Sequence, residues 1–173
     1  GIATLSMAWF AQPFFKEVNI PLAYFGILWA GLNFSAGLTS FNSHKFDKSE
    51  SNPRMLIFLA LAMVASFLFL GLNTTLLGLI FVVFIYLLRG IVTPILRNSI
   101  NKNTTSNKRA TVLSIRSFII RISFAICAPI LGYLADNYSL ETTFYTLALI
   151  VGIFSIISSI QLYLIDKNHS FAS

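Results

Sequence analysis

Long apolar runs separated by short polar connectors make up most of this 173-residue chain. A helix needs roughly 20 mostly apolar residues to cross a bilayer core, because each residue adds only about 1.5 Å of length. A shorter run at the start, residues 1–15, is expected to be the second half of a span that begins upstream. Five further runs are long enough, at residues 21–42, 53–73, 76–97, 112–134 and 140–164. The pattern therefore predicts an all-α integral membrane protein, built as a six-helix transmembrane bundle.

The composition favours a membrane protein over a soluble one. Hydrophobic residues make up 56% of the chain and charged residues only 10%, whereas soluble domains carry about 25% charged residues. So few polar residues cannot cover a surface that faces water. The net charge of +6 does not indicate nucleic-acid binding, because the charges lie in the gaps between apolar runs instead of forming one patch. The first predicted partner is therefore the lipid bilayer.

Basic residues are distributed unequally between the two ends of the predicted bundle. The connectors at 16–21, 71–75 and 135–142 share one end and contain a single basic residue, Lys16. The other end, called the basic end below, carries Lys45, Lys48, Arg54, Lys102, Lys108, Arg109 and Lys167. By the positive-inside rule, we expect the basic end and the C-terminus to be cytoplasmic, with the protein in the cytoplasmic membrane.

Two arginines lie inside apolar runs, where a charge is costly and often functional. Arg89 is more than halfway along the fourth run, on one helix face with Tyr86, and Arg121 is well inside the fifth. The second run aligns Trp29 with Asn33, whereas the third run has scarcely a polar atom and is expected to face lipid over most of its circumference. These faces favour a wetted cleft. Alternatively, the arginines snorkel or pair with backbone carbonyls, and small residues four apart, such as Ala128 and Gly132, only allow close helix packing.

Groups that could carry catalysis are missing from the apolar runs. The acidic residues all lie at or beyond the predicted helix ends, as Glu17, Asp47, Glu50, Asp136, Glu141 and Asp166. His44 and His169 lie outside the runs, and the single cysteine, Cys127, can form neither an intrachain disulfide nor a thiolate metal cluster. No hydrolase, metalloprotease or nucleotide-binding motif is present. We therefore predict no enzymatic activity, no metal site and no cofactor.

Several specific features of residues 87–140 resemble the tenth and eleventh spans of major facilitator superfamily transporters. They are an Arg-Gly pair followed by a proline, a basic loop ending in Arg-Ala-Thr-Val-Leu-Ser, and a Gly-Tyr-Leu-Ala-Asp helix end. The segment WFAQPFFKEVNIP, residues 9–21, is similar to the end of a seventh span. The resemblance covers residues 1–173 as the C-terminal six-helix half of a twelve-helix fold, with its first span truncated.

This resemblance implies a secondary transporter that moves a small solute by alternating access. It implies a substrate cavity near the bilayer midplane and a partner that the chain lacks, the N-terminal six-helix half. The candidate cavity residues are Gln12, Trp29, Asn33, Tyr86, Arg89 and Arg121. An arginine favours an anionic or strongly hydrogen-bonding solute, and Trp29 and Tyr86 offer stacking surfaces.

The loop that includes residues 37–48 occupies the place of the family's cytoplasmic gating motif. It has the glycine and a later Asp-Lys pair but not the full spacing. Asp47, Lys48 and Arg109 are the candidate gate residues. The alternative function is a stand-alone six-helix membrane scaffold or partner protein that transports nothing.

Overall fold

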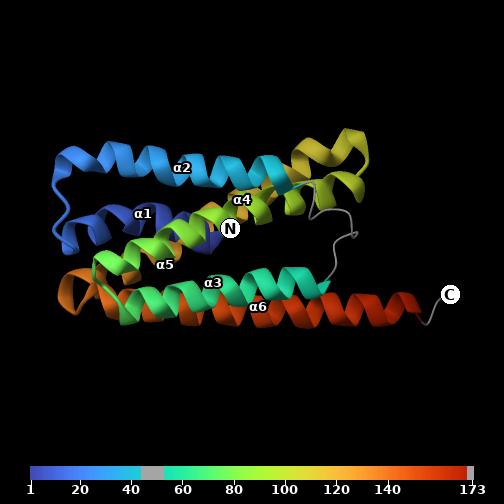
Figure 1. Ribbon diagram of the computed structural model, residues 1–173. Coiled ribbons are helices and arrows are strands. Elements are labelled where there is room, and N and C mark those ends of the chain that lie inside the picture. Colours follow the sequence, from blue (N-terminus) through green and yellow to red (C-terminus); the bar gives the residue numbers. More distant parts are fainter. Residues whose placement is uncertain (44–52, 171–173) are drawn as a thin grey trace.

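The computed structural model describes residues 1–43 and 53–170, and within these it places the side chains of residues 1–43 and 55–160. This part of the chain forms six α-helices and two short 3₁₀ turns (Figure 1). The helices are α1 (Ile2–Glu17), α2 (Phe25–Asn42), α3 (Pro53–Leu72), α4 (Leu79–Lys102), α5 (Ser106–Asn137) and α6 (Leu140–Ser170). The 3₁₀ turns, η1 (Leu22–Tyr24) and η3 (Leu76–Gly78), precede α2 and α4.

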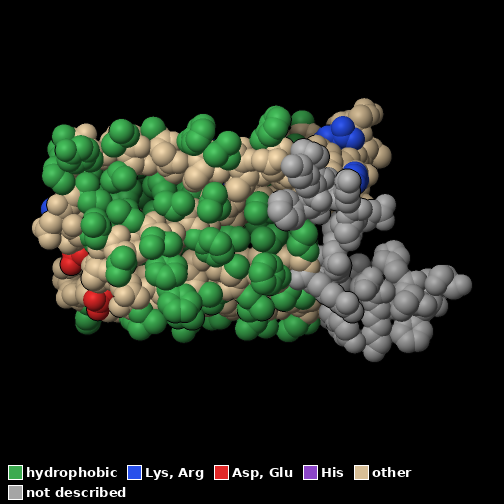
Figure 2. All heavy atoms as spheres, in the orientation of Figure 1, with side chains coloured by type: hydrophobic (Ala, Val, Ile, Leu, Met, Phe, Trp, Pro, Cys, Tyr) green, Lys and Arg blue, Asp and Glu red, His purple; other side chains and the backbone are tan. Residues whose placement is uncertain are grey.

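The helices confirm the predicted all-α membrane fold. Within the described residues, five helical segments are long and apolar enough to cross a bilayer, and they correspond to α2 through α6. Helix α1 has 16 residues and spans only about 24 Å, which is less than a bilayer core of about 30 Å. Its first residue accordingly lies part-way along the bundle (Figure 1). The flanks of the bundle seen in Figure 2 are mostly apolar, as expected of a surface that faces lipid.

Two helix pairs form the frame of the bundle. Helix α3 packs along α6, helix α2 packs along α4, and α3 also contacts α4. Helix α1 lies against α4, α5 and α6 and contributes a row of buried aromatic side chains. The ring of Phe144 on α6 contacts Phe14 on α1 at 6.1 Å and Phe67 on α3 at 6.5 Å between centroids. These edge-on and tilted contacts give α1 a fixed position between the two pairs.

Burial differs among the candidate membrane spans. In α3, 33% of the residues in the apolar window are buried, compared with 6% in α2 and 6% in α5. Leu59, Met63 and Phe67 are among the buried residues of α3. Most residues of this window are nevertheless not buried, so the expectation that this span faces lipid over most of its circumference stays a prediction. Hydropathy cannot distinguish an apolar side chain that faces lipid from one that faces a neighbouring helix, because the two environments are equally apolar.

The connector between α4 and α5 is shorter than the polar sequence suggests. The gap between the apolar runs 76–97 and 112–134 predicts a loop over residues 98–111, but α4 continues to Lys102 and α5 begins at Ser106. Polar residues mark the point where a segment leaves the bilayer, but the helix can continue beyond that point, because a helix with polar side chains can also form in water. Arg109 then donates a hydrogen bond from Nη2 to the carbonyl oxygen of Asn101 at 2.9 Å. A positive group there satisfies and stabilises the last turn of α4.

At the opposite end of the bundle, local backbone conformation and hydrogen bonds fix where the helices end and begin. After α1, Asn19 adopts a left-handed conformation with φ of 57°, and the N–H of Ile20 donates to the carbonyl of Phe15 at 3.0 Å. Asparagine tolerates this conformation better than other non-glycine residues. Ser139 caps α6, because its Oγ accepts a hydrogen bond from the N–H of Thr142 at 3.1 Å.

Candidate functional site: a cleft between α1, α4 and α5

Helices α1, α4 and α5 line an open cleft with a volume of about 600 Å³. Three arginines line it, Arg89 from α4 together with Arg116 and Arg121 from α5. Three hydroxyl side chains also line it, those of Thr4, Thr93 and Ser117. Among the described residues, neither aspartate nor glutamate lines the cleft. Its walls therefore combine strong hydrogen-bond donors with an uncompensated positive charge.

Two of these arginines lie at similar depths on facing helices. Measured from the basic end, Arg89 is about 20 Å from the end of α4 at Lys102, and Arg121 is about 22 Å from the start of α5 at Ser106. Both are close to the middle of their helices. Arg116 lies about 7 Å nearer the basic end than Arg121. The guanidinium carbon of Arg89 is 5.4 Å from the ring centroid of Tyr86, which is a cation–π distance. Tyr86 therefore supports Arg89 from the core side.

Aromatic side chains form the apolar part of the cleft wall. Trp9 on α1 stacks on Phe124 on α5, with 6.1 Å between ring centroids and 23° between ring planes. Both residues line the cleft, and Trp9 has 66% of its side chain exposed. Such a flat surface can pack against the body of a solute while the arginines bind its polar group.

The other sequence-predicted cavity residues lie elsewhere. Tyr86 is only 1% exposed and packs edge-on against Trp29, with 6.2 Å between centroids, at the contact of α2 with α4. Neither the Tyr86 hydroxyl nor Trp29 Nε1 has a hydrogen-bond partner among the described residues. The amide of Asn33 donates to the carbonyl of Trp29 at 2.9 Å, and Gln12 is exposed on α1 away from the cleft lining. The cleft therefore brings together Arg89 and Arg121 from the predicted set.

The candidate gate residues are only partly visible. Asp47 and Lys48 lie outside the described residues. Arg109 is described, but it caps α4 through the carbonyls of Asn101 and Thr104. Its contacts are those of a structural residue, and its role in gating stays a prediction.

Two residues of the cleft are not among the sequence-predicted candidates, Trp9 and Arg116. The first apolar run is too short to show a helix face, so the sequence gives no signal for Trp9. Arg116 is 140° from Arg121 around the helix, and periodicity alone therefore points it away from the face of Arg121. The cleft wraps around a wide arc of α5, however, and a long arginine side chain reaches into it from the side. Both arginines therefore line the same space.

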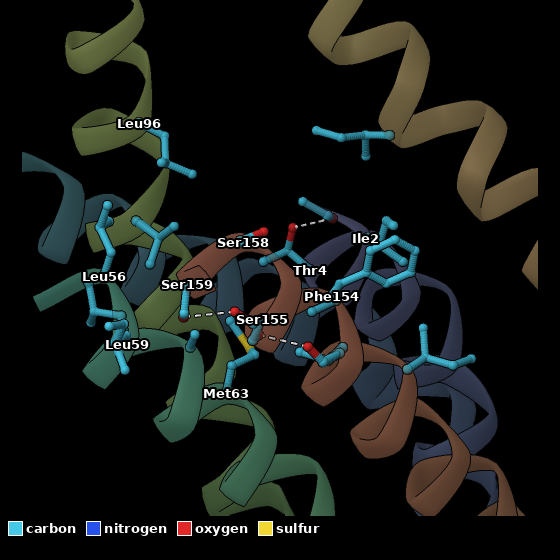
Figure 3. A pocket seen from close by; sticks show the side chains of 18 residues that line it. Ile2, Thr4, Leu56, Leu59, Met63, Leu96, Phe154, Ser155, Ser158 and Ser159 are labelled. Atoms are coloured by element: carbon cyan, nitrogen blue, oxygen red, sulfur yellow. Dashed lines mark hydrogen bonds between the residues drawn. The ribbon is translucent and has the colours of Figure 1, made fainter. Parts of the chain in front are cut away.

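A second cavity of about 360 Å³ lies beside the first, around the start of α1 (Figure 3). It is lined mainly by apolar side chains such as Leu56, Met63 and Phe154. Its hydroxyl groups are largely engaged within their own helices, because Ser155 donates to the carbonyl of Val151 and Ser159 to that of Ser155. This cavity offers packing space but little polar recognition.

A comparison with protein families assigns the fold. The sequence profile of the Major Facilitator Superfamily matches residues 1–170. The chain belongs to the Major Facilitator Superfamily. No curated protein and no solved structure gives a significant match. Major Facilitator Superfamily proteins are membrane-embedded secondary transporters and not enzymes, so membership implies transport of a solute across a membrane.

Membership in the Major Facilitator Superfamily also agrees with the chemistry of the cleft. The described residues hold no group of three or more His, Cys, Asp or Glu side chains that could bind a metal ion. What the cleft does offer is a set of fixed donors and an aromatic wall. These groups can bind and release a solute without chemically changing it.

Proposed function

We propose that this chain is the C-terminal six-helix half of a secondary transporter and that a small solute passes through the cleft between α1, α4 and α5. The observation that carries the proposal is a cleft lined by three arginines inside the apolar bundle of a Major Facilitator Superfamily member. Charges at this depth are retained where they face a pathway or a ligand. The solute would bind near the midplane and be exposed to one side of the membrane at a time.

The exposed faces of α2 and α5 support the proposal that a second six-helix half packs against this chain. These two helices are the least buried of the candidate spans, and both carry large apolar side chains that the described part of the chain leaves exposed. They include Ile27 and Phe34 on α2, and Phe118 and Ile126 on α5. Six further helices packed against α2 and α5 would cover these faces and close the cleft on its open side.

The basic end supports an orientation in the cytoplasmic membrane. Lys102, Lys108 and Arg109 lie around the turn between α4 and α5, and Lys and Arg side chains gather mainly at this end in Figure 2. We infer from the positive-inside rule that this end and the C-terminus face the cytoplasm. In that orientation, Arg116 is the cleft arginine closest to the cytoplasm.

Labelling of introduced cysteines tests the transport pathway. Thr93→Cys on α4 and Ser117→Cys on α5 would be made in the full-length protein without its native cysteines. Each variant is treated with a membrane-impermeant, thiol-reactive sulfonate in right-side-out and in inside-out vesicles. Alternating access predicts that both positions react from both sides of the membrane, because both line the cleft. Leu149→Cys is the matched control, since Leu149 is 62% exposed on α6 but does not line the cleft.

The same experiment separates transport from the alternative of a six-helix membrane partner protein. If the cleft is permanently closed at one end, the two cysteines would react from one side of the membrane only. If it is closed at both ends, they would react from neither side. If Thr93→Cys and Ser117→Cys behave like Leu149→Cys in both vesicle orientations, the pathway proposal fails and the partner function is favoured.

A further inference from the structure

We propose that the cleft binds a small organic anion, with its oxyanion group between Arg89 and Arg121 and its apolar body against Trp9 and Phe124. The inference rests on the transport function proposed above and names the class of solute. It excludes cationic and neutral solutes as the preferred cargo.

The first argument concerns the depth of the charges. Arg89 and Arg121 both lie near the middle of their helices, whereas snorkelling to the headgroups is expected of arginines near helix ends. An uncompensated guanidinium costs several kcal/mol at such a depth. Two of them on facing helices repel each other as well. An anion held between them would remove both costs.

The second argument concerns the source of the opposite charge. The described carboxylates belong to Glu17, Asp136 and Glu141, which lie at helix ends away from the cleft lining. The remaining acidic residues of the chain lie outside the apolar runs. Among the described residues, therefore, none can neutralise the arginines of the cleft. Because no described residue supplies the neutralising group, we infer that a bound solute does.

The third argument concerns geometry. A guanidinium presents a planar fork of donors that matches the two oxygens of a carboxylate or the oxygens of a phosphate. The Trp9–Phe124 pair lines the same cleft as these forks, and its stacked rings offer a flat apolar surface. A solute with one oxyanion and an aromatic or apolar body uses both surfaces.

Oxyanion chemistry could also come from a lipid headgroup. Arg116 lies closest to the basic end and would meet a phosphate of the bilayer before Arg89 or Arg121 does. The distinction between lipid and solute therefore depends on the two deeper arginines. It also depends on whether soluble anions compete for the site.

A panel of probes with one ring and different charges tests the inference. Benzoate and phenyl phosphate are the anions, benzamide is neutral and benzylamine is cationic. Protection of Ser117→Cys from the labelling reagent is measured with the full-length protein in phosphatidylcholine nanodiscs. We expect protection by at least one anion and none by benzamide or benzylamine.

Arginine substitutions identify the groups that bind the anion. Arg89→Gln and Arg121→Gln should each weaken protection by roughly tenfold or more, because each removes charge-assisted hydrogen bonds to the anion. Arg89→Lys should keep part of the protection, since it retains the charge and loses the planar fork. Arg97→Gln is the matched control, because Arg97 lies on α4 but does not line the cleft.

The outcomes separate this inference from the proposed function. Labelling from both membrane sides without protection by either anion overturns the anion inference and leaves the transport pathway standing. Protection by benzamide or benzylamine overturns it as well. If phosphatidylglycerol in the nanodiscs protects Ser117→Cys through Arg89 and Arg121 while the soluble anions do not, the oxyanion belongs to lipid and the solute inference is refuted. Loss of labelling from either side is instead a failure of the proposed function.

Discussion

The contact between α2 and α4 depends on the absence of a side chain at Gly90. A methyl group there would collide with Thr39 Oγ1 and with the carbonyl oxygen of Ala36, both on α2. Overpacking of this kind typically costs about 1–3 kcal/mol, while alanine regains about 0.5–1 kcal/mol of helix propensity over glycine. Gly90→Ala should therefore destabilise the protein by up to about 2.5 kcal/mol net. The assay is the apparent melting temperature of the purified full-length protein in detergent.

A glycine in an open position provides the control. A Cβ at Gly152 on α6 would meet nothing within 4 Å, so Gly152→Ala should leave the melting temperature unchanged or raise it slightly. The double variant Gly90→Ala/Thr39→Ala should recover only part of the loss, because the carbonyl of Ala36 belongs to the backbone and cannot move aside. A Gly90→Ala protein as stable as Gly152→Ala would refute the close approach of α2 and α4.

Three further predictions concern other parts of the bundle. Thr39→Val removes the hydrogen bond from Thr39 Oγ1 to the carbonyl of Leu87 at 3.0 Å, and its loss should cost about 1 kcal/mol in the same melting assay. Asn19→Val should destabilise by roughly 1–2 kcal/mol because valine resists positive φ, whereas Asn19→Gly should be neutral or stabilising; equal effects would contradict the turn geometry. Reporter fusions after Lys108 should be cytoplasmic and those at Asn73 external, and the reverse pattern would refute the proposed orientation.

The fold was predictable because membrane insertion leaves few choices. An apolar run of about 20 residues must satisfy its own backbone hydrogen bonds, so it becomes a helix whatever its exact sequence. The predicted beginning of α3 at Pro53 matches the structure, since proline suits a first helical position. The burial of α3 was not predictable from hydropathy. Lateral packing depends on which helices meet. The same apolar side chains of α3 can face lipid or pack against Phe144, and their hydropathy is the same in both cases.

Only the charged residues of the candidate site could be predicted from the sequence. Arg89 and Arg121 stood out because arginine is costly in a bilayer, and the structure places both at one cleft. Helix periodicity alone could not predict which residues surround Arg89, because it shows which residues share a face of one helix but not which other helix packs against that face. Tyr86 shares that face yet points into the core, and Trp9 comes from a helix for which no face could be assigned.

The rotation of α4 about its own axis connects the packing of the bundle with the chemistry of the cleft. Gly90 turns its bare backbone toward Ala36 and Thr39, and this contact allows α2 to approach α4 closely. One helical turn before Gly90, Tyr86 fills the same contact against Trp29. Arg89 lies between these two positions in sequence and about 100° from Gly90 around the helix, so it is directed out of the α2 contact and into the cleft. The position of the charge that we propose binds solute is thus set by residues outside the cleft lining. Substitution of Gly90 should therefore change the accessibility of the cleft as well as the stability of the bundle.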